Sequence, residues 1–295
     1  MKTRRNRIGV GTVQWGMNYG VANYDGRTPA DEVARILAAG RTFGLQVLDT
    51  AALYGEAESV LGENDLSGMQ VVTKTPRYGH SPITAADAAD LKATLNRSLA
   101  RLRLPSAHGL LAHHADDLLA PGGERLIDAL RELREERKVG GIGVSVYDGA
   151  QIEAVLARFT PDLVQLPLNV FDQRLIADGS LARLASQGIK IHARSAFLQG
   201  LLLMPPDSAP AYFAPWRELL RAWHAHCAVL GVLPQQAALA FVCDRPEVNC
   251  CLVGVQNLTQ LKQLLAGLDE APSMDLASFA CNDAALVNPA NWRYS

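Results

Sequence analysis

Short apolar runs alternate along the chain with longer stretches whose apolar residues recur every three or four positions. The short runs are typical of buried β-strands, and the longer stretches are typical of helices that bury one face. Eight runs fit a strand: Ile8–Gly11, Leu45–Asp49, Gln70–Thr75, Gly109–His113, Gly141–Ser145, Leu163–Pro167, Ile189–Arg194 and Asn249–Val253.

The stretches between these runs carry ordinary helix signals. Thr28 precedes Pro29, and proline is favoured at the first helical position. Leu91, Leu95 and Leu99 recur four apart and share one helix face. Helices are predicted over Pro29–Phe43, Glu56–Leu61, Ala86–Leu102, Glu124–Lys138, Gln151–Phe159, Ser180–Gln187, Pro234–Val242 and Leu258–Leu265.

Strict alternation of strand and helix predicts a parallel sheet, because parallel strands need crossover helices. Dividing 295 residues by eight units gives ~37 residues per unit, which suits a closed (β/α)₈ TIM barrel. The alternative is an open, doubly wound sheet whose first strand leads into Gly-x-Gly-x-x-Gly. Because Gly9–Gln14 lacks the third glycine, a single barrel domain over residues 1–295 is predicted.

Two segments exceed the eight units. Residues 197–233 are rich in proline and aromatic residues and include a further helix candidate, Trp216–Leu230. Residues 267–295 follow the last predicted helix. Long segments beside a barrel often carry function. We therefore expect a loop insertion and a C-terminal tail that cover the active site.

Composition and charge narrow the classes of function. The chain is 48% hydrophobic with a mean hydropathy of +0.03, as in ordinary globular proteins. A net charge of -2 provides no basic excess for binding nucleic acid or an anionic membrane. The basic first residues are not followed by the apolar segment of a secretory leader. Five cysteines without a Cys-x-x-Cys pair suit a reducing cytoplasm.

Polar residues gather where the predicted strands end. Asp49, Lys74 and His113 end three successive strands, and Tyr54 follows shortly after the first of them. The C-terminal ends of the strands form the active-site face of a TIM barrel. An ammonium stabilises a neighbouring phenolate, a carboxylate keeps that ammonium charged, and an imidazole orients a carbonyl oxygen. Such a set transfers a proton but supplies no electrons, so it requires a hydride donor.

Two histidine pairs have the composition of metal ligands. Successive strand side chains point to opposite faces, so His113 and His114 are expected to diverge. His224 and His226 lie two positions apart on a predicted helix and are expected to diverge as well. We therefore predict no metal site.

Taken together, these segments resemble the aldo-keto reductases over essentially the whole chain. The order and spacing of the motifs, more than any single motif, produce the resemblance. The matching segments are Ile8-Gly-Val-Gly-Thr12, Leu48-Asp-Thr-Ala-Ala-Leu-Tyr-Gly55, Val71-Val-Thr-Lys74, Leu110-Leu-Ala-His113, Ile142-Gly-Val-Ser145, Asp162-Leu-Val-Gln165, Gln235-Gln-Ala-Ala-Leu-Ala240 and Leu252-Val-Gly-Val-Gln-Asn-Leu-Thr-Gln260.

The resemblance implies a barrel that reduces aldehydes or ketones with a nicotinamide nucleotide. It places the catalytic tetrad on Asp49, Tyr54, Lys74 and His113, with Tyr54 as the proton donor. It implies cofactor contacts at Ser145, Gln165, Arg194, Ser195, Leu198, Gly200, Gly254, Gln256 and Gln260.

Two positions depart from the family pattern beside the nicotinamide. Val146 replaces the asparagine that often follows Ser145, so one carboxamide hydrogen bond is missing. Arg194 replaces an aromatic residue that commonly stacks on the nicotinamide. A planar guanidinium can take over this stacking, or it can meet a phosphate or an acidic substrate group.

The resemblance also implies NADP(H), whose adenosine 2′-phosphate the family binds with basic residues after the eighth strand. Here that segment reads Gly254-Val-Gln-Asn257, followed by Gln260, and Lys262 is the nearest cation. Because selecting a 2′-phosphate needs charge-assisted contacts, use of NAD(H) stays open beside NADP(H).

Two other functions fit the same residues. Lys74 could form a Schiff base, as in barrel aldolases, but this needs a lysine with a depressed pKa, which Asp49 opposes. Some relatives bind the nucleotide as non-catalytic interaction modules. For the reductase reading, we expect a small-molecule carbonyl substrate of a polar or sugar-like kind. The oligomeric state does not follow from the sequence.

Overall fold

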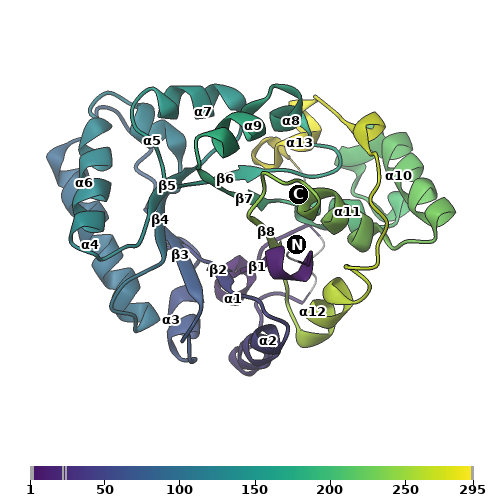
Figure 1. Ribbon diagram of the computed structural model, residues 1–295, viewed down its shortest axis with the longest axis horizontal. Helices are drawn as coiled ribbons and strands as arrows, with labels where there is room; N and C mark the ends of the chain where they lie inside the picture. Colours follow the sequence, from purple (N-terminus) through teal and green to yellow (C-terminus); the bar gives the residue numbers. More distant parts are fainter. Residues whose placement is uncertain (1–2, 22, 24, 294–295) are drawn as a thin grey trace.

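The computed structural model describes residues 3–21, 23 and 25–293. Its centre is a closed barrel of eight parallel strands in sequence order, in which the last strand pairs with the first (Figure 1). The predicted TIM barrel and all eight predicted strands are confirmed. The strands are β1 (Ile8–Gly11), β2 (Val47–Asp49), β3 (Gln70–Lys74), β4 (Gly109–Ala112), β5 (Ile142–Ser145), β6 (Leu163–Pro167), β7 (Lys190–Arg194) and β8 (Cys250–Gly254).

Helices surround the barrel on its outside (Figure 1). All predicted helices are present. Four others, α1, α5, α8 and α13, were not predicted, because helices of four or five residues show no apolar period. The set is α1 (Val13–Gly16), α2 (Ala30–Thr42), α3 (Ala57–Gly62), α4 (Ala85–Leu102), α5 (Ala115–Leu119), α6 (Glu124–Glu135), α7 (Gly149–Leu156), α8 (Arg174–Ala177), α9 (Ser180–Ser186), α10 (Arg217–Leu230), α11 (Pro234–Cys243), α12 (Leu258–Leu265) and α13 (Ala284–Val287).

Capping and backbone conformation explain two shifted helix ends. Helix α7 begins two residues before the predicted Gln151, because the Asp148 side chain accepts a hydrogen bond from the Gln151 backbone N–H at 2.9 Å. Helix α6 ends at Glu135 and not at Lys138, because Arg137 adopts a left-handed conformation with a φ of 59°.

The barrel interior is filled by side chains. Val72, Leu111 and Leu163 form an apolar cluster of their own inside the ring of strands. The interior at Gly9 is too narrow for a side chain, since a Cβ there would lie 2.6 Å from the Cys250 sulfur. Side chains two positions further along a strand point to the same interior face. Lys74 and Gln165, two positions after Val72 and Leu163, therefore reach the C-terminal rim above a closed core.

The predicted insertion forms α10 and three short 3₁₀ helices, and the tail packs against it. The Tyr212 hydroxyl donates to the Ala285 carbonyl at 2.9 Å, and the Trp223 and Phe279 rings meet edge to face. Helices α10 and α13 lie on the same side of the barrel (Figure 1). None of the described tail residues lines the rim cavity. The expectation that the tail covers the site is therefore wrong, because its apolar residues are buried against the insertion.

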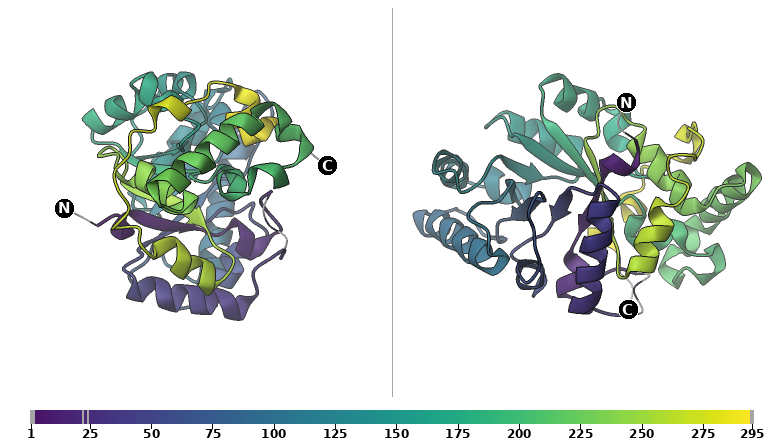
Figure 2. Two further views of the ribbon diagram at one scale, coloured as in Figure 1. Left: turned by 90° about the vertical axis from the view of Figure 1, so that its right-hand side faces the viewer. Right: turned by 60° about the horizontal axis from the view of Figure 1, so that its bottom comes forward.

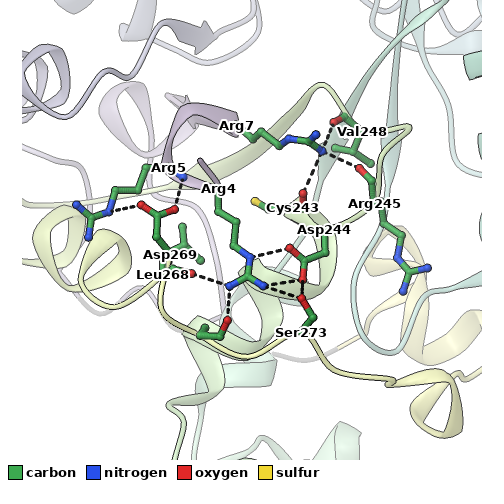
Figure 3. A network of polar contacts seen from close by, with 11 residues as sticks. Arg4, Arg5, Arg7, Cys243, Asp244, Arg245, Val248, Leu268, Asp269 and Ser273 are labelled. Carbon is green, nitrogen blue, oxygen red and sulfur yellow. Dashed lines mark hydrogen bonds and ion pairs between the residues drawn. The ribbon is translucent and has the colours of Figure 1, made fainter. Parts of the chain in front are cut away.

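At the opposite end, the segment before β1 fastens the base of the barrel (Figure 3). Arg4 donates to both carboxylate oxygens of Asp244 at 2.6 and 2.7 Å, to the Leu268 carbonyl at 3.0 Å and to the Ser273 hydroxyl at 3.1 Å. Arg7 donates to the backbone carbonyls of Cys243, Arg245 and Val248. These bonds join the start of the chain to α11 and to the segment after α12.

Two further expectations concern cysteines and membranes. All five cysteines are free, as predicted. Among the described residues, no single helix has the length and apolarity to cross a bilayer, and one bent pair, Ala211–Leu230 with Pro234–Cys243, meets the test together. A cytoplasmic location stays a prediction.

Candidate functional site

A cavity of about 460 Å³ opens at the C-terminal rim of the barrel. Its volume is in the range of small-molecule sites. Two predicted site residues do not line it: Lys74 lies behind the cavity wall, and the Leu198 side chain is buried in the core. The other predicted residues all line it, namely Asp49, Tyr54, His113, Ser145, Gln165, Arg194, Ser195, Gly200, Gly254, Gln256 and Gln260.

Lys74 links Asp49 to Tyr54. Its side chain is 1% exposed, and its Nζ donates to Asp49 Oδ2 at 2.6 Å, to the Thr50 carbonyl at 3.0 Å and to the Tyr54 hydroxyl at 3.5 Å. Burial alone would lower the pKa of Lys74, but the charge of Asp49 and the hydrogen bonds raise that pKa above its ordinary value. Lys74 is therefore a fixed ammonium directed at the phenol oxygen.

Two glycines position the Tyr54 loop between β2 and α3. Gly16, at the end of α1, contacts this loop so closely that a Cβ would overlap the Tyr54 carbonyl oxygen and the Ala57 nitrogen. Gly55 has a φ of 54°, in the left-handed region that favours glycine. The sequence analysis missed Gly16, because its role depends on this contact with a distant segment.

His113 lies beside the phenol as a neutral imidazole. Its ring meets the Tyr54 ring edge to face, with centroids 5.7 Å apart. Burial, together with the positive charge of Lys74, lowers the pKa of His113 from 6.5 to about 3. Its buried Nδ1 has no hydrogen-bond partner among the described residues. A neutral imidazole in this place can donate a hydrogen bond to an oxygen without taking its proton.

The prediction that His113 and His114 diverge is wrong. Their rings stack with centroids 4.9 Å apart and an angle of 24° between the planes. Strand β4 ends at Ala112, so both histidines follow the strand and its alternation no longer applies. Within the described ranges, no group of three or more histidine, cysteine and acidic side chains is arranged to hold a metal ion.

Gln165 connects the tetrad to the cavity. Its Nε2 donates to Asp49 Oδ1 at 2.7 Å, so Asp49 accepts from both Gln165 and Lys74. The strand register places Ser145 directly beside Gln165. A hydroxyl and an amide oxygen on adjacent strands match the donor and acceptor needs of a carboxamide group.

The guanidinium of Arg194 stacks on Tyr147. Its Cζ lies 4.5 Å from the centroid of the Tyr147 ring, and its Nη2 donates to the Val146 carbonyl at 3.0 Å. These contacts hold the plane of the guanidinium at the cavity wall. Tyr147 follows β5 by two residues and was not among the predicted site residues.

The loop after β7 has an unusual backbone. Ser195, Leu198 and Gln199 are non-glycine residues with φ values of 62°, 48° and 55°. Such conformations are costly and cluster at ligand-binding segments. Leu198 anchors the loop in the core, with its backbone N–H donating to the Ser195 carbonyl at 2.8 Å. The buried Leu198 side chain therefore cannot make the predicted cofactor contact, whereas Gly200 lines the cavity.

Glycines form the cavity floor where β1 and β8 end, and the strand register places Gly11 between Asp49 and Gly254. A Cβ on Gly11 would meet no atom closer than 3.8 Å, whereas one on Gly254 would come within 2.7 Å of Gln14 Oε1, which has no partner among the described residues. Among the described residues that line the cavity, only Asp49 and Arg194 carry a formal charge at neutral pH. A carboxamide-matched end and a floor of glycines fit a nicotinamide dinucleotide.

Comparisons with known proteins agree with this geometry. A sequence model of the Aldo/keto reductase family matches residues 7–277. L-galactose dehydrogenase of Arabidopsis thaliana is 27% identical over an alignment of 286 residues that covers 91% of this chain and 86% of that protein. An aldo-keto reductase from Bacillus halodurans, in its holo form, shares the fold with a TM-score of 0.75 at 19% identity, covering 97% of this chain and 95% of its own.

Proposed function

The chain belongs to the aldo/keto reductase family, and on that premise we propose that it interconverts an aldehyde or ketone and an alcohol with a nicotinamide dinucleotide. One observation is the main support: Lys74 joins Asp49 to the Tyr54 hydroxyl at the cavity wall. A phenol held against a fixed ammonium can pass its proton to an oxygen in the cavity, because the ammonium stabilises the phenolate that remains.

Each member of the tetrad has a separate task. In the reducing direction, Tyr54 donates a proton to the carbonyl oxygen, and Lys74 stabilises the phenolate that remains. Asp49 keeps Lys74 charged and is itself oriented by Gln165. The neutral imidazole of His113 donates a hydrogen bond to the same oxygen and places it for proton transfer. A bound nicotinamide dinucleotide supplies or accepts the hydride.

The remaining cavity residues would hold that dinucleotide. We assign the carboxamide contacts to Ser145 and Gln165, and stacking on the nicotinamide to Arg194, which Tyr147 supports from one face. The other contacts are assigned to Ser195, Gly200, Gly254, Gln256 and Gln260.

For the substrate, we propose a polyhydroxylated, sugar-like carbonyl compound. The Arabidopsis relative is named for L-galactose, an aldose. Gln14, whose buried Oε1 has no partner among the described residues, lines the cavity and can accept a hydrogen bond from a hydroxyl group.

Schiff-base chemistry is less well supported. A Schiff-base lysine needs a depressed pKa and an accessible nitrogen. The pKa of Lys74 is raised, its side chain is 1% exposed, and it does not line the cavity.

The test is turnover by a tyrosine variant. Purified protein should oxidise NADH or NADPH in the presence of aldoses and simple aldehydes, followed by the nucleotide absorbance. Tyr54→Phe should lose most of this turnover and still bind the nucleotide. Tyr212→Phe is the matched control, because its hydroxyl contacts the Ala285 carbonyl away from the cavity.

Three outcomes would contradict the proposal. Full activity in Tyr54→Phe would show that Tyr54 is not the proton donor. Tight nucleotide binding without turnover on any carbonyl indicates an interaction module. Borohydride trapping of a substrate on the wild-type protein, with its loss in Lys74→Arg, indicates an aldolase.

A further inference from the structure

The far end of the rim cavity is lined by residues of helix α12, among them Gln260 and Gln263, and α12 lies side by side with α2 (Figure 2). A smaller cavity of about 200 Å³ adjoins it, and Gln256 lines both. Glu32 from α2 and Asn257, the residue before α12, also line the smaller cavity. A dinucleotide whose nicotinamide lies beside Tyr54 has its adenosine at the end away from the tetrad, and this is the direction in which the cavity extends.

The N-terminus of α12 is already occupied by a carboxylate of the protein. Glu32 Oε1 accepts a hydrogen bond from the Leu258 backbone N–H at 2.6 Å, and the Asn257 side chain accepts one from the Gln260 backbone N–H at 2.8 Å. Helix N-termini bind phosphates through such N–H groups and the helix dipole. Here, Glu32 has taken the place that an anionic ligand would use.

The residues that line the smaller cavity carry a net negative charge. Arg35 pairs with Glu32 at 2.9 Å and also with Asp31, so its charge is already shared by two acids. The Glu32 side chain is 15% exposed, which limits screening by solvent. The acids that line the smaller cavity outnumber the bases, with Asp25, Asp31 and Glu32 against Arg27 and Arg35.

We propose that Glu32 makes this protein select NAD(H) over NADP(H), an inference that rests on the proposed function. A 2′-phosphate at this end of the cavity meets a partly buried carboxylate and a helix N-terminus whose Leu258 N–H is already bonded. A 2′-hydroxyl is neutral and can donate a hydrogen bond to a carboxylate. This selection is the reverse of the NADP(H) use that the family resemblance implies.

The test is a binding titration without substrate. Quenching of tryptophan fluorescence gives the dissociation constants of NADH and NADPH for wild type and Glu32→Gln. The wild type should bind NADH about tenfold or more tightly than NADPH, a ratio that shrinks at high salt. Glu32→Gln should strengthen NADPH binding by about tenfold and change NADH binding by less than about twofold. Asp128→Asn is the control, because this acid pairs with Arg131 on helix α6 and lines neither cavity, and it should leave the ratio unchanged.

The outcomes separate the inference from the proposed function. Wild-type binding of NADPH as tight as that of NADH, or tighter, overturns the role of Glu32. Equal changes in both affinities in Glu32→Gln also overturn it, because they indicate a purely structural residue. Failure of the wild type to bind either nucleotide rejects the proposed function and this inference with it. If Glu32→Gln does not fold, the ratio of the wild-type dissociation constants for NADPH and NADH, and its dependence on salt, test the inference.

Discussion

Two ion pairs of equal length lie at opposite ends of the barrel. At the base, Arg4 Nε lies 2.6 Å from Asp244 (Figure 3), and at the rim, Lys74 Nζ lies 2.6 Å from Asp49. All three guanidinium nitrogens of Arg4 donate to protein acceptors. At the rim, the third contact of Lys74 is the long one to Tyr54, whose ring lines the cavity.

The two pairs differ in the other hydrogen bonds that Arg4 and Lys74 make. At the base, those of Arg4 join segments that are far apart in the sequence, so its ion pair is structural. Among the described residues, buried polar atoms without a partner occur at both ends, for example Arg245 Nε near the base and His113 Nδ1 and Gln14 Oε1 at the rim. The two at the rim belong to residues that line the cavity, where a ligand can supply the missing hydrogen bonds.

The largest effect is expected from breaking the rim pair. Lys74→Met removes the ammonium that stabilises the Tyr54 phenolate, and turnover should fall by about 10²–10⁴-fold. Steady-state kinetics with the best substrate measures the loss, and circular dichroism shows whether the variant is folded. A folded variant with wild-type turnover would contradict the role of Lys74.

Breaking the base pair should change stability but not chemistry. Arg4→Met leaves the Leu268 and Ala271 carbonyls without this donor and Asp244 with Ser273 alone, so the free energy of unfolding should fall by about 2–3 kcal/mol. Turnover at a temperature where the variant is folded should stay at the wild-type value. The matched control, Arg131→Met, breaks an exposed pair with Asp128 and should cost about 0.5 kcal/mol or less. Loss of activity at unchanged stability would remove the distinction between base and rim.

As the pH falls, the stability contributed by histidines at the rim and inside the barrel should be lost before that contributed by the base. Burial lowers the pKa of His113 to about 3 and that of His192, inside the barrel, to about 4, from the ordinary 6.5. As the pH falls below 6.5, the histidines of the unfolded chain therefore take up protons while those of the folded chain stay neutral. The stability that the neutral histidines contribute is complete above pH 6.5 and is lost as the pH falls below that value. Each histidine contributes at most about 1.4 kcal/mol per pH unit.

At the base, the titrating group is a carboxyl. Burial raises the pKa of Asp244, but hydrogen bonds from Arg4 and Ser273 outweigh it and hold the pKa below the ordinary 3.8. Its contribution is present above pH 3.8 and is lost only below that value. Urea unfolding at a series of pH values should show that the free energy of unfolding declines between neutral pH and pH 5. This decline should be smaller in His113→Gln and unchanged in Arg4→Met. The same decline in wild type and His113→Gln would contradict this assignment.

The smallest effect is expected from moving the phenol slightly. Gly16→Ala pushes the Tyr54 loop away, because the new Cβ overlaps the Tyr54 carbonyl. Turnover should fall by about tenfold, since small displacements of reacting groups are costly. Gly68→Ala is the control: its φ of 77° makes the substitution strained, but a Cβ there meets nothing within 4 Å and Gly68 does not line the cavity, so turnover should not change. Equal turnover in the two variants would show that Gly16 does not position Tyr54.

The residues on strands could be predicted from the sequence, and those that depend on loops could not. Asp49 and Lys74 end strands, so the period of two and the parallel register place them on one interior rim. Tyr147 and Glu32 become visible only when the backbone path brings them to the cavity or to another helix. For Leu198 the sequence was misleading: its motif position matches the family pattern, but its side chain is buried in the core.

The most direct measurement is the fate of a labelled hydride. The protein is given NADH deuterated on the transferring side of nicotinamide C4, an aldehyde or aldose, and time for turnover, and the alcohol is analysed by mass spectrometry. The account predicts a deuterium on the former carbonyl carbon with wild type, and almost no labelled alcohol with Tyr54→Phe. Alcohol without the label from either face of C4, or equal labelled product from Tyr54→Phe, would contradict it.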